Sequence, residues 1–163
     1  MAQPRKWNDD EAGAIVARHR HLPGAMLPIL HALQDAFGYV DRKAIPLVAD
    51  ALNVSRAEVH GVLGFYHDYR TEPAGRHVIK LCRAEACQSM GCETLLRHVE
   101  ERVGAKLGAT NADRSFTIEP VYCLGNCALS PALMLDGKLH GRVTPERADW
   151  LIAEARANAR RRP

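Results

Sequence analysis

Apolar residues recur every three or four positions through the first part of the chain, which is the period of an amphipathic helix. The clearest case covers residues 26–37, and Gly38 directly after it is a typical C-terminal helix stop. Asn8 is placed to cap an earlier helix that runs to about Arg20. Because no strand-like alternation occurs in this region, we expect residues 1–74 to form a helical domain.

Two further helices are predicted in this domain, each from a residue that can cap its first turn. Asp41 is expected to cap a helix that ends near Leu52. Ser55 and Glu58 have the spacing of a capping box, in which each side chain bonds the other residue's backbone N–H. The sequence therefore predicts an N-terminal four-helix bundle.

The pattern changes after residue 74, where strand-like segments begin to alternate with helical ones. The pair Asp136-Gly137 lies between two short apolar segments and predicts a hairpin. The predicted elements are a strand at 77–82, a helix at 93–103, a strand at 116–122, a hairpin of 132–135 and 138–140, and a helix at 146–157. This order predicts an α/β domain of thioredoxin-like size over residues 75–163.

The charge of the chain is small and is concentrated at one end. The 22 Lys and Arg residues exceed the 19 Asp and Glu residues by three, but four arginines lie in residues 156–163 with no acid among them. These are Arg156, Arg160, Arg161 and Arg162. A near-neutral body gives little support for nucleic-acid binding, so we expect no nucleic-acid partner.

Neither a secretory signal nor a membrane span is indicated by the apolar segments, which are all too short. We therefore expect a cytoplasmic protein. Thiols are kept reduced in that compartment, so the five cysteines are better suited to metal or cofactor binding, or to burial, than to disulfides.

Four of the cysteines form two spaced pairs. Cys82 and Cys87 are a C-x4-C pair, and Cys123 and Cys127 are a C-x3-C pair. The first pair begins at the end of one predicted strand and the second directly after the end of another. If the two strand ends lie side by side, four thiolates meet, and soft thiolates select zinc or iron–sulfur clusters. The spacing leaves a [2Fe–2S] cluster, zinc and unliganded thiols open. Cys92 is interpreted as a small buried apolar residue.

The surroundings of these cysteines resemble a known family. The pattern comprises the C-x4-C pair with Gly91, the segment Cys-Leu-Gly-Asn-Cys at 123–127, Pro131 and the Asp136-Gly137 turn. It resembles the thioredoxin-like [2Fe–2S] ferredoxin subunits of NADH-linked complexes. The resemblance covers nearly the whole chain, because it continues through the segments at 27–31, 37–40 and 64–66. The segment Cys-Arg-Ala-Glu-Ala-Cys-Gln at 82–88 is most similar to the gamma subunit of soluble NAD-dependent formate dehydrogenases.

The resemblance implies one [2Fe–2S] cluster, with Cys82 and Cys87 on one iron and Cys123 and Cys127 on the other. It implies an electron-transfer subunit with no catalytic residues of its own, in a hetero-oligomer. The implied partners are a flavoprotein subunit that binds FMN and NAD and a large molybdenum- and iron–sulfur-containing subunit that oxidises formate. Residues 1–74 would contact the partner. Pro131 lies where thioredoxin-like folds often place a cis-proline.

Other interpretations remain. The equivalent subunit of NADH:quinone oxidoreductase or of an NAD-reducing hydrogenase fits the same pattern. Residues 48–59 resemble a helix-turn-helix, which together with an iron–sulfur site would suggest a redox-sensing DNA-binding regulator. The would-be recognition helix at 56–66 has a single arginine, where base readout usually needs more polar donors. A structural zinc protein is the third alternative.

Overall fold

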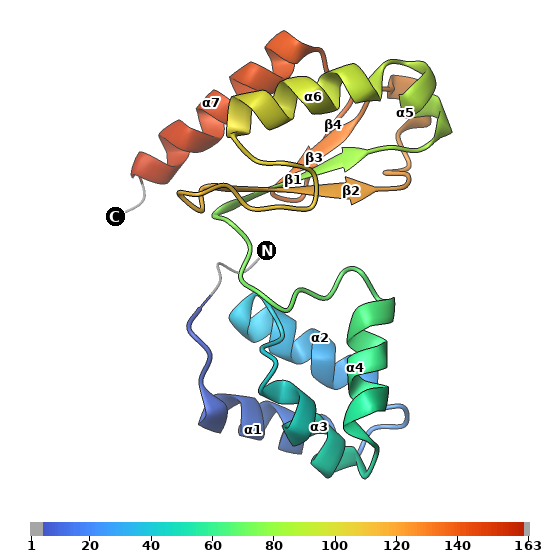
Figure 1. The fold of residues 1–163 in the computed structure, drawn as a ribbon, viewed down its shortest axis with the longest axis vertical. Helices are drawn as coiled ribbons and strands as arrows, with labels where there is room; N and C mark the ends of the chain where they lie inside the picture. The colour runs from blue at the N-terminus through green and yellow to red at the C-terminus, as the bar shows by residue number, and fades with distance from the viewer. Residues whose placement is uncertain (1–4, 162–163) are drawn as a thin grey trace. The chain divides into compact units, whose positions relative to one another are not determined.

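The protein forms two compact units, Met1–Pro73 and Ala74–Pro163. A computed structural model describes residues 5–161, with side chains described for residues 5–158. Each unit has a hydrophobic core of its own. In Figure 1 the first unit is coloured blue to green and the second green to red.

Helices account for the regular structure of the first unit. They are α1 (Asp9–His19), α2 (Met26–Phe37), α3 (Ala44–Leu52) and α4 (Arg56–Phe65). Their apolar faces meet in a core that includes the fully buried Ile29, Leu30, Leu33 and Phe37 of α2. Helix α1 packs against α2 and α3, and α3 packs against α4.

Three of the predicted helix signals are confirmed. The Asn8 side chain accepts a hydrogen bond from the Glu11 N–H (2.8 Å), as an N-cap does. Gly38 ends α2 with φ 81°, in the left-handed region. Ser55 Oγ accepts from the Glu58 N–H (3.2 Å) while Glu58 Oε2 accepts from the Ser55 N–H (2.8 Å), which completes the capping box.

The prediction that Asp41 caps the third helix is wrong. Helix α3 begins at Ala44, and its N-cap Lys43 makes no side-chain cap bond. Asp41 instead stabilises the turn before the helix, because its Oδ1 accepts from the Lys43 N–H (2.9 Å) and its carbonyl accepts from the Ala44 N–H (2.8 Å). Asp41 lies two residues before the N-cap position, so its side chain bonds the preceding turn and not the first turn of α3.

A four-stranded sheet with helices on one face makes up the second unit (Figure 1). The strands are β1 (His77–Cys82), β2 (Phe116–Val121), β3 (Leu133–Leu135) and β4 (Lys138–His140), in the order β2-β1-β3-β4. Strands β1 and β2 are parallel, whereas β3 pairs antiparallel with both β1 and β4. The long helices are α6 (Cys92–Val103) and α7 (Pro145–Arg161).

The core of this unit lies between the sheet and these two helices. Buried strand residues Ile79, Leu81 and Ile118 belong to one cluster with Val99 of α6 and Leu151 of α7. The mixed sheet with a helical layer matches the α/β domain predicted from the sequence.

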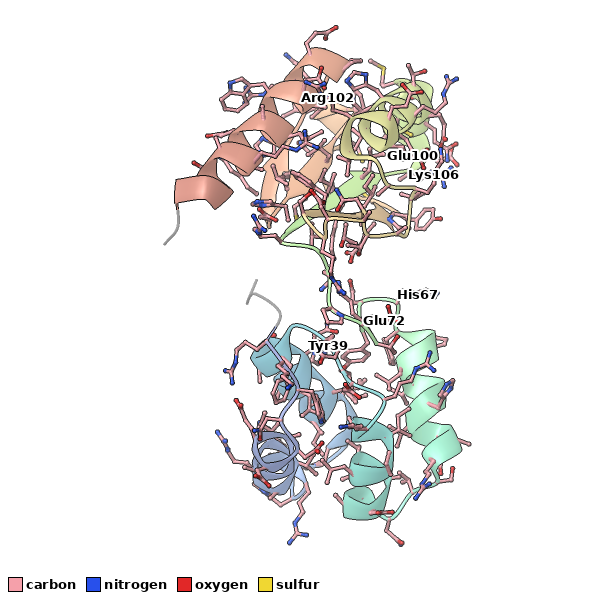
Figure 2. The ribbon with its side chains drawn as sticks, turned by 60° about the vertical axis from the view of Figure 1, so that its left-hand side comes forward. Tyr39, His67, Glu72, Glu100, Arg102 and Lys106 are labelled. Carbon is pink, nitrogen blue, oxygen red and sulfur yellow. The ribbon has the colours of Figure 1, made fainter. Side chains whose placement is uncertain are left out.

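Glu100 ties the end of α6 to the loop that follows it. Its carboxylate accepts hydrogen bonds from Lys106 Nζ and from the Leu107 N–H, both at 2.8 Å. Figure 2 shows the labelled Glu100 and Lys106 side chains next to each other.

Two short elements are absent from the prediction. A five-residue helix α5 (Glu85–Ser89) and a 3₁₀ helix η1 (Cys127–Leu129) contain one cysteine each.

Helix α7 extends beyond the predicted end near Ala157. In the arginine-rich segment at 156–163, the Arg156 guanidinium donates to the Arg102 carbonyl (3.2 Å). The side chains of the other three arginines lie outside the described residues.

Within residues 5–161, no helix is both long enough and apolar enough to cross a lipid bilayer.

Candidate metal centre

Two neighbouring strands bring the four paired cysteines to one edge of the sheet. Strands β1 and β2 are parallel (Figure 1). Cys82 at the end of β1 is in register with Val121 at the end of β2. Cys123 comes two residues after Val121. The expectation that the two strand ends lie side by side is confirmed.

Cys82 is buried and is surrounded by hydrogen-bond donors. Burial acts to raise the pKa of its thiol, but hydrogen bonds from the Ala84 N–H, the Cys87 side chain and the N–H groups of Leu124 and Cys123 lower that pKa overall. The groups that lower this pKa come from both cysteine loops, which are residues 82–87 and 123–127. They favour its thiolate form, which is the form that binds metal.

Cys87 lies in α5 and is also buried. Its Sγ is 3.6 Å from the Ser130 Oγ, and that hydroxyl donates to the Cys127 carbonyl (2.7 Å). Ser130 thus contacts both cysteine loops at once. It precedes Pro131, and the Ser130–Pro131 peptide bond is cis, as the family resemblance implied.

Cys123 and Cys127 form the exposed pair. Their Sγ atoms are 3.8 Å apart, and the hydrogen bond with the Cys123 side chain raises the pKa of Cys127. The Gly125 N–H donates to Cys123 Sγ (3.3 Å) from a backbone with φ 73°, a conformation that favours glycine. Gly125 therefore lets a backbone N–H group approach the sulfur.

Cys92 differs from the other four cysteines. It is fully buried at the start of α6 and belongs to the core of the second unit, and burial raises the pKa of its thiol. The interpretation of Cys92 as a buried apolar residue agrees with this position.

Gly141 packs closely against the loop that carries Cys123 and Cys127, and it was not predicted from the sequence. A Cβ atom at this position would lie 2.6 Å from Asn126 Nδ2, 2.7 Å from Leu129 Cβ and 2.9 Å from the Leu129 carbonyl oxygen. The next residue, Arg142, donates its N–H to that same carbonyl (2.6 Å). A glycine directly after the predicted hairpin was the signal available in the sequence.

Ser130 was missed as well, because a serine before a proline carries no distinctive pattern. Its contact with Cys87 joins residues 43 positions apart, which only the folded chain brings together.

Comparison with known proteins places the chain in a family. The profile of the thioredoxin-like [2Fe–2S] ferredoxin family matches residues 12–156. The chain is 38% identical over 122 residues to the NADH-quinone oxidoreductase E subunit of Pseudomonas aeruginosa, covering 75% of this chain and 74% of that protein. It is 34% identical over 151 residues to the NADH-quinone oxidoreductase E 2 subunit of Rhizobium meliloti, covering 93% and 90%.

A hydrogenase subunit is similar too. The HndA subunit of the NADP-reducing hydrogenase of Solidesulfovibrio fructosivorans is 33% identical over 131 residues, covering 80% of this chain and 77% of that one. Among solved structures, the air-oxidised NAD⁺-reducing [NiFe]-hydrogenase has a TM-score of 0.69 at 24% identity, over 90% of this chain. This chain spans 25% of the hydrogenase chain. Because the identity is low, the match supports a shared fold and nothing more.

The residues present fit a [2Fe–2S] cluster in their chemistry. A two-iron cluster takes four thiolates, two on each iron, and the sheet edge carries two sulfur pairs with backbone N–H groups directed at them. In the described part of the chain, no three Cys, His, Asp or Glu side chains are grouped closely enough to hold a single metal ion.

The family profile and the relatives support electron transfer over the DNA-binding and structural zinc alternatives. The family profile covers most of both units, and the relatives named above are subunits of oxidoreductase complexes. The chain belongs to the thioredoxin-like [2Fe–2S] ferredoxin family, as an electron-transfer subunit whose cofactor is one [2Fe–2S] cluster.

Proposed function

We propose that Cys82 and Cys87 bind one iron of the cluster and that Cys123 and Cys127 bind the other. The observation that carries this proposal is the parallel pairing of β1 with β2, which brings both pairs to one edge of the sheet. When bound, the cluster supplies one-electron redox chemistry.

The protein's own groups hold the sulfurs and stabilise negative charge on them. N–H groups of Ala84, Leu124 and Cys123 lower the pKa of Cys82, and the Gly125 N–H donates to Cys123 Sγ at 3.3 Å. Such hydrogen bonds to sulfur tune the reduction potential of an iron–sulfur centre. The first pair is shielded from water by burial, whereas the second is exposed. We therefore expect electrons to be exchanged on the side of Cys123 and Cys127, where the path to the surface is shortest.

Apolar side chains near the cysteines support docking of a partner there. Met90, Tyr122 and Leu129 each lie within three residues of one of the four cysteines and are exposed, Tyr122 by 72%. Exposed aromatic and methionine side chains are enriched at protein interfaces.

The partner that we infer is a flavoprotein subunit that binds FMN and NAD. A flavin is needed between a two-electron hydride donor and a one-electron cluster, and the named relatives are subunits of NADH-quinone oxidoreductases and of an NADP-reducing hydrogenase.

For the parent complex we propose a cytoplasmic, molybdenum-containing, NAD-dependent formate dehydrogenase, in which this chain is the gamma subunit. The segment at residues 82–88 supports this choice. The large molybdenum- and iron–sulfur-containing subunit would then be the second partner. NADH:quinone oxidoreductase and NAD-reducing hydrogenase are the second candidates, and the relatives named above favour them.

The first unit is proposed to contact the flavoprotein through the end of α4. Phe65 is 74% exposed and packs edge to face on Tyr66, with ring centroids 5.1 Å apart. Tyr69, four residues after Phe65, is buried in the core of the first unit and is not part of this surface.

The test is to tag the chain in its source cell, purify the intact complex and assay it. We expect a flavoprotein and a molybdenum subunit to co-purify, with formate-dependent NAD reduction. Hydrogen-dependent NAD reduction, or NADH-dependent quinone reduction, without formate-dependent activity would assign the chain to one of the second candidates. The Phe65→Ala variant should weaken co-purification, whereas Trp150→Ala, which removes an exposed aromatic side chain from α7, serves as the matched control.

A further inference from the structure

A serine hydroxyl lies between the two cysteine pairs. Ser130 is buried, its Oγ is 3.6 Å from Cys87 Sγ, and it donates to the Cys127 carbonyl at 2.7 Å. It belongs to neither cysteine loop of the sequence motif, since it follows η1.

The hydrogen-bond roles at this position depend on whether Cys87 carries a proton. In the structure the Cys87 thiol is the donor and Ser130 Oγ the acceptor. A thiolate that binds iron has no proton left and can only accept a hydrogen bond. The Ser130 hydroxyl has one hydrogen, which can then point to Cys87 Sγ or to the Cys127 carbonyl.

Nothing in the fold of the loop requires this hydroxyl. The Cys127 carbonyl also accepts the backbone N–H of Ser130 at 3.3 Å, so it keeps a partner when the side-chain oxygen is removed. An alanine at position 130 thus leaves no buried carbonyl without a hydrogen bond.

We propose that Ser130 is a positioning residue that donates a hydrogen bond to Cys87 Sγ and raises the reduction potential of the cluster. This inference rests on the proposed ligand role of Cys87. One-electron reduction adds negative charge that is shared by the sulfur ligands, and an O–H directed at sulfur stabilises that charge. The hydroxyl keeps its proton and exchanges its hydrogen bond to the Cys127 carbonyl for one to Cys87 Sγ, so no covalent bond is formed or broken.

The experiment is an anaerobic redox titration of the full chain, with its cluster bound, using dithionite as the reductant. The variants are Ser130→Ala, which removes the donor, and Ser130→Thr, which keeps it. Ser89→Ala is the matched control, because the Ser89 hydroxyl donates to the Ala86 carbonyl (2.9 Å) beside the same cysteine. Iron and sulfide content and the thermal unfolding temperature are measured on every variant.

We expect Ser130→Ala to retain the cluster and to have a lower midpoint potential, with Ser130→Thr and Ser89→Ala close to the unchanged chain. Removal of the donor should also alter the iron–sulfur stretching bands in the resonance Raman spectrum, which a purely structural role would leave in place. An unchanged potential and spectrum in a fully loaded Ser130→Ala chain would overturn the inference while leaving the proposed function intact. A chain that binds no cluster before any substitution would instead overturn the proposed function.

Discussion

The Sγ atoms of Cys123 and Cys127 are 3.8 Å apart at the surface, close enough for either thiol to donate to the other. The Gly125 N–H also points at Cys123 Sγ, so the loop between the two cysteines is already folded around its sulfurs. The other pair, Cys82 and Cys87, is buried. The site therefore has a shielded side and an open side.

Each of the four paired cysteines is expected to be necessary for the cluster. We expect each of four variants to lose the cluster or to hold it less stably, because a hydroxyl is a poor replacement for a soft thiolate. They are Cys82→Ser, Cys87→Ser, Cys123→Ser and Cys127→Ser. Iron content and visible absorption of the anaerobically purified chain measure this effect.

Cys92→Ala is the control for these substitutions. Its iron content should equal that of the unchanged chain, because Cys92 is a buried core residue in this account. Loss of the cluster in Cys92→Ala, with the cluster retained in one of the other four variants, would contradict the proposed ligand set.

Gly141→Ala is expected to loosen the second cysteine loop. The new Cβ would approach Leu129 Cβ and the Leu129 carbonyl within 3 Å, so the loop that carries Cys127 must shift. Groups that support metal ligands typically matter by factors of about 10–100, so we expect roughly tenfold faster loss of the cluster. The rate is followed by the decay of visible absorption in the presence of a chelator.

The matched control is Gly13→Ala in α1, where a Cβ meets nothing within 4 Å. It should leave cluster retention unchanged and stabilise the chain by about 0.5–1 kcal/mol, the usual gain for alanine over glycine in a helix. Equal cluster retention in Gly141→Ala and Gly13→Ala would show that Gly141 does not support the site.

Ser55→Ala should destabilise the first unit. The substitution removes the Ser55 Oγ that accepts the Glu58 N–H, and loss of an N-cap of this kind costs about 1 kcal/mol. Urea unfolding followed by circular dichroism measures the free energy of unfolding. The cluster content should not change, since the cysteines lie in the other unit, and a fall in that content would argue against independent roles for the two units.

The bonds that Glu100 makes at the end of α6 should make stability depend on pH in the acid range. Hydrogen bonds from Lys106 Nζ and the Leu107 N–H lower the pKa of Glu100 from its ordinary value of 4.5. A carboxyl whose pKa is lower in the folded chain stabilises it fully above pH 4.5, and this stabilisation is lost as the pH falls through the lowered pKa.

Glu100→Gln tests this dependence in the cluster-free chain. The variant should unfold at a lower temperature than the unchanged chain at pH 7, and the difference should shrink as the pH is lowered below 4.5. A difference that stays constant with pH would mean that the charge of Glu100 does not contribute.

Local signals in the sequence predicted most elements of this fold. Asn8, Gly38 and the Ser55–Glu58 pair act through bonds within a few residues, so their roles follow from spacing alone. Asp41 shows the limit of such reasoning, since a capping side chain can serve a turn just ahead of the helix.

Contacts between distant residues could not be predicted in the same way. The Asp136-Gly137 turn predicts a hairpin, but not that β3 of this hairpin pairs with β1. That pairing lets the Asp136 carboxylate accept from the Val78 N–H (2.8 Å) and approach His77 Nδ1 (2.6 Å). Helix α5 and the 3₁₀ helix η1 are too short to show a period of apolar positions, because each has at most five residues.

In the candidate site, the four paired cysteines could be selected from spacing and from the family resemblance. Their supporting residues could not, because Ser130 and Gly141 reach the cysteine loops only through the folded chain.

The most direct test of the central claim is the metal and sulfide content of the unchanged chain, purified under anaerobic conditions. The account predicts two irons and two acid-labile sulfides for each chain, visible absorption, and a paramagnetic signal after one-electron reduction. One zinc ion for each chain, with no visible absorption and no labile sulfide, would contradict it.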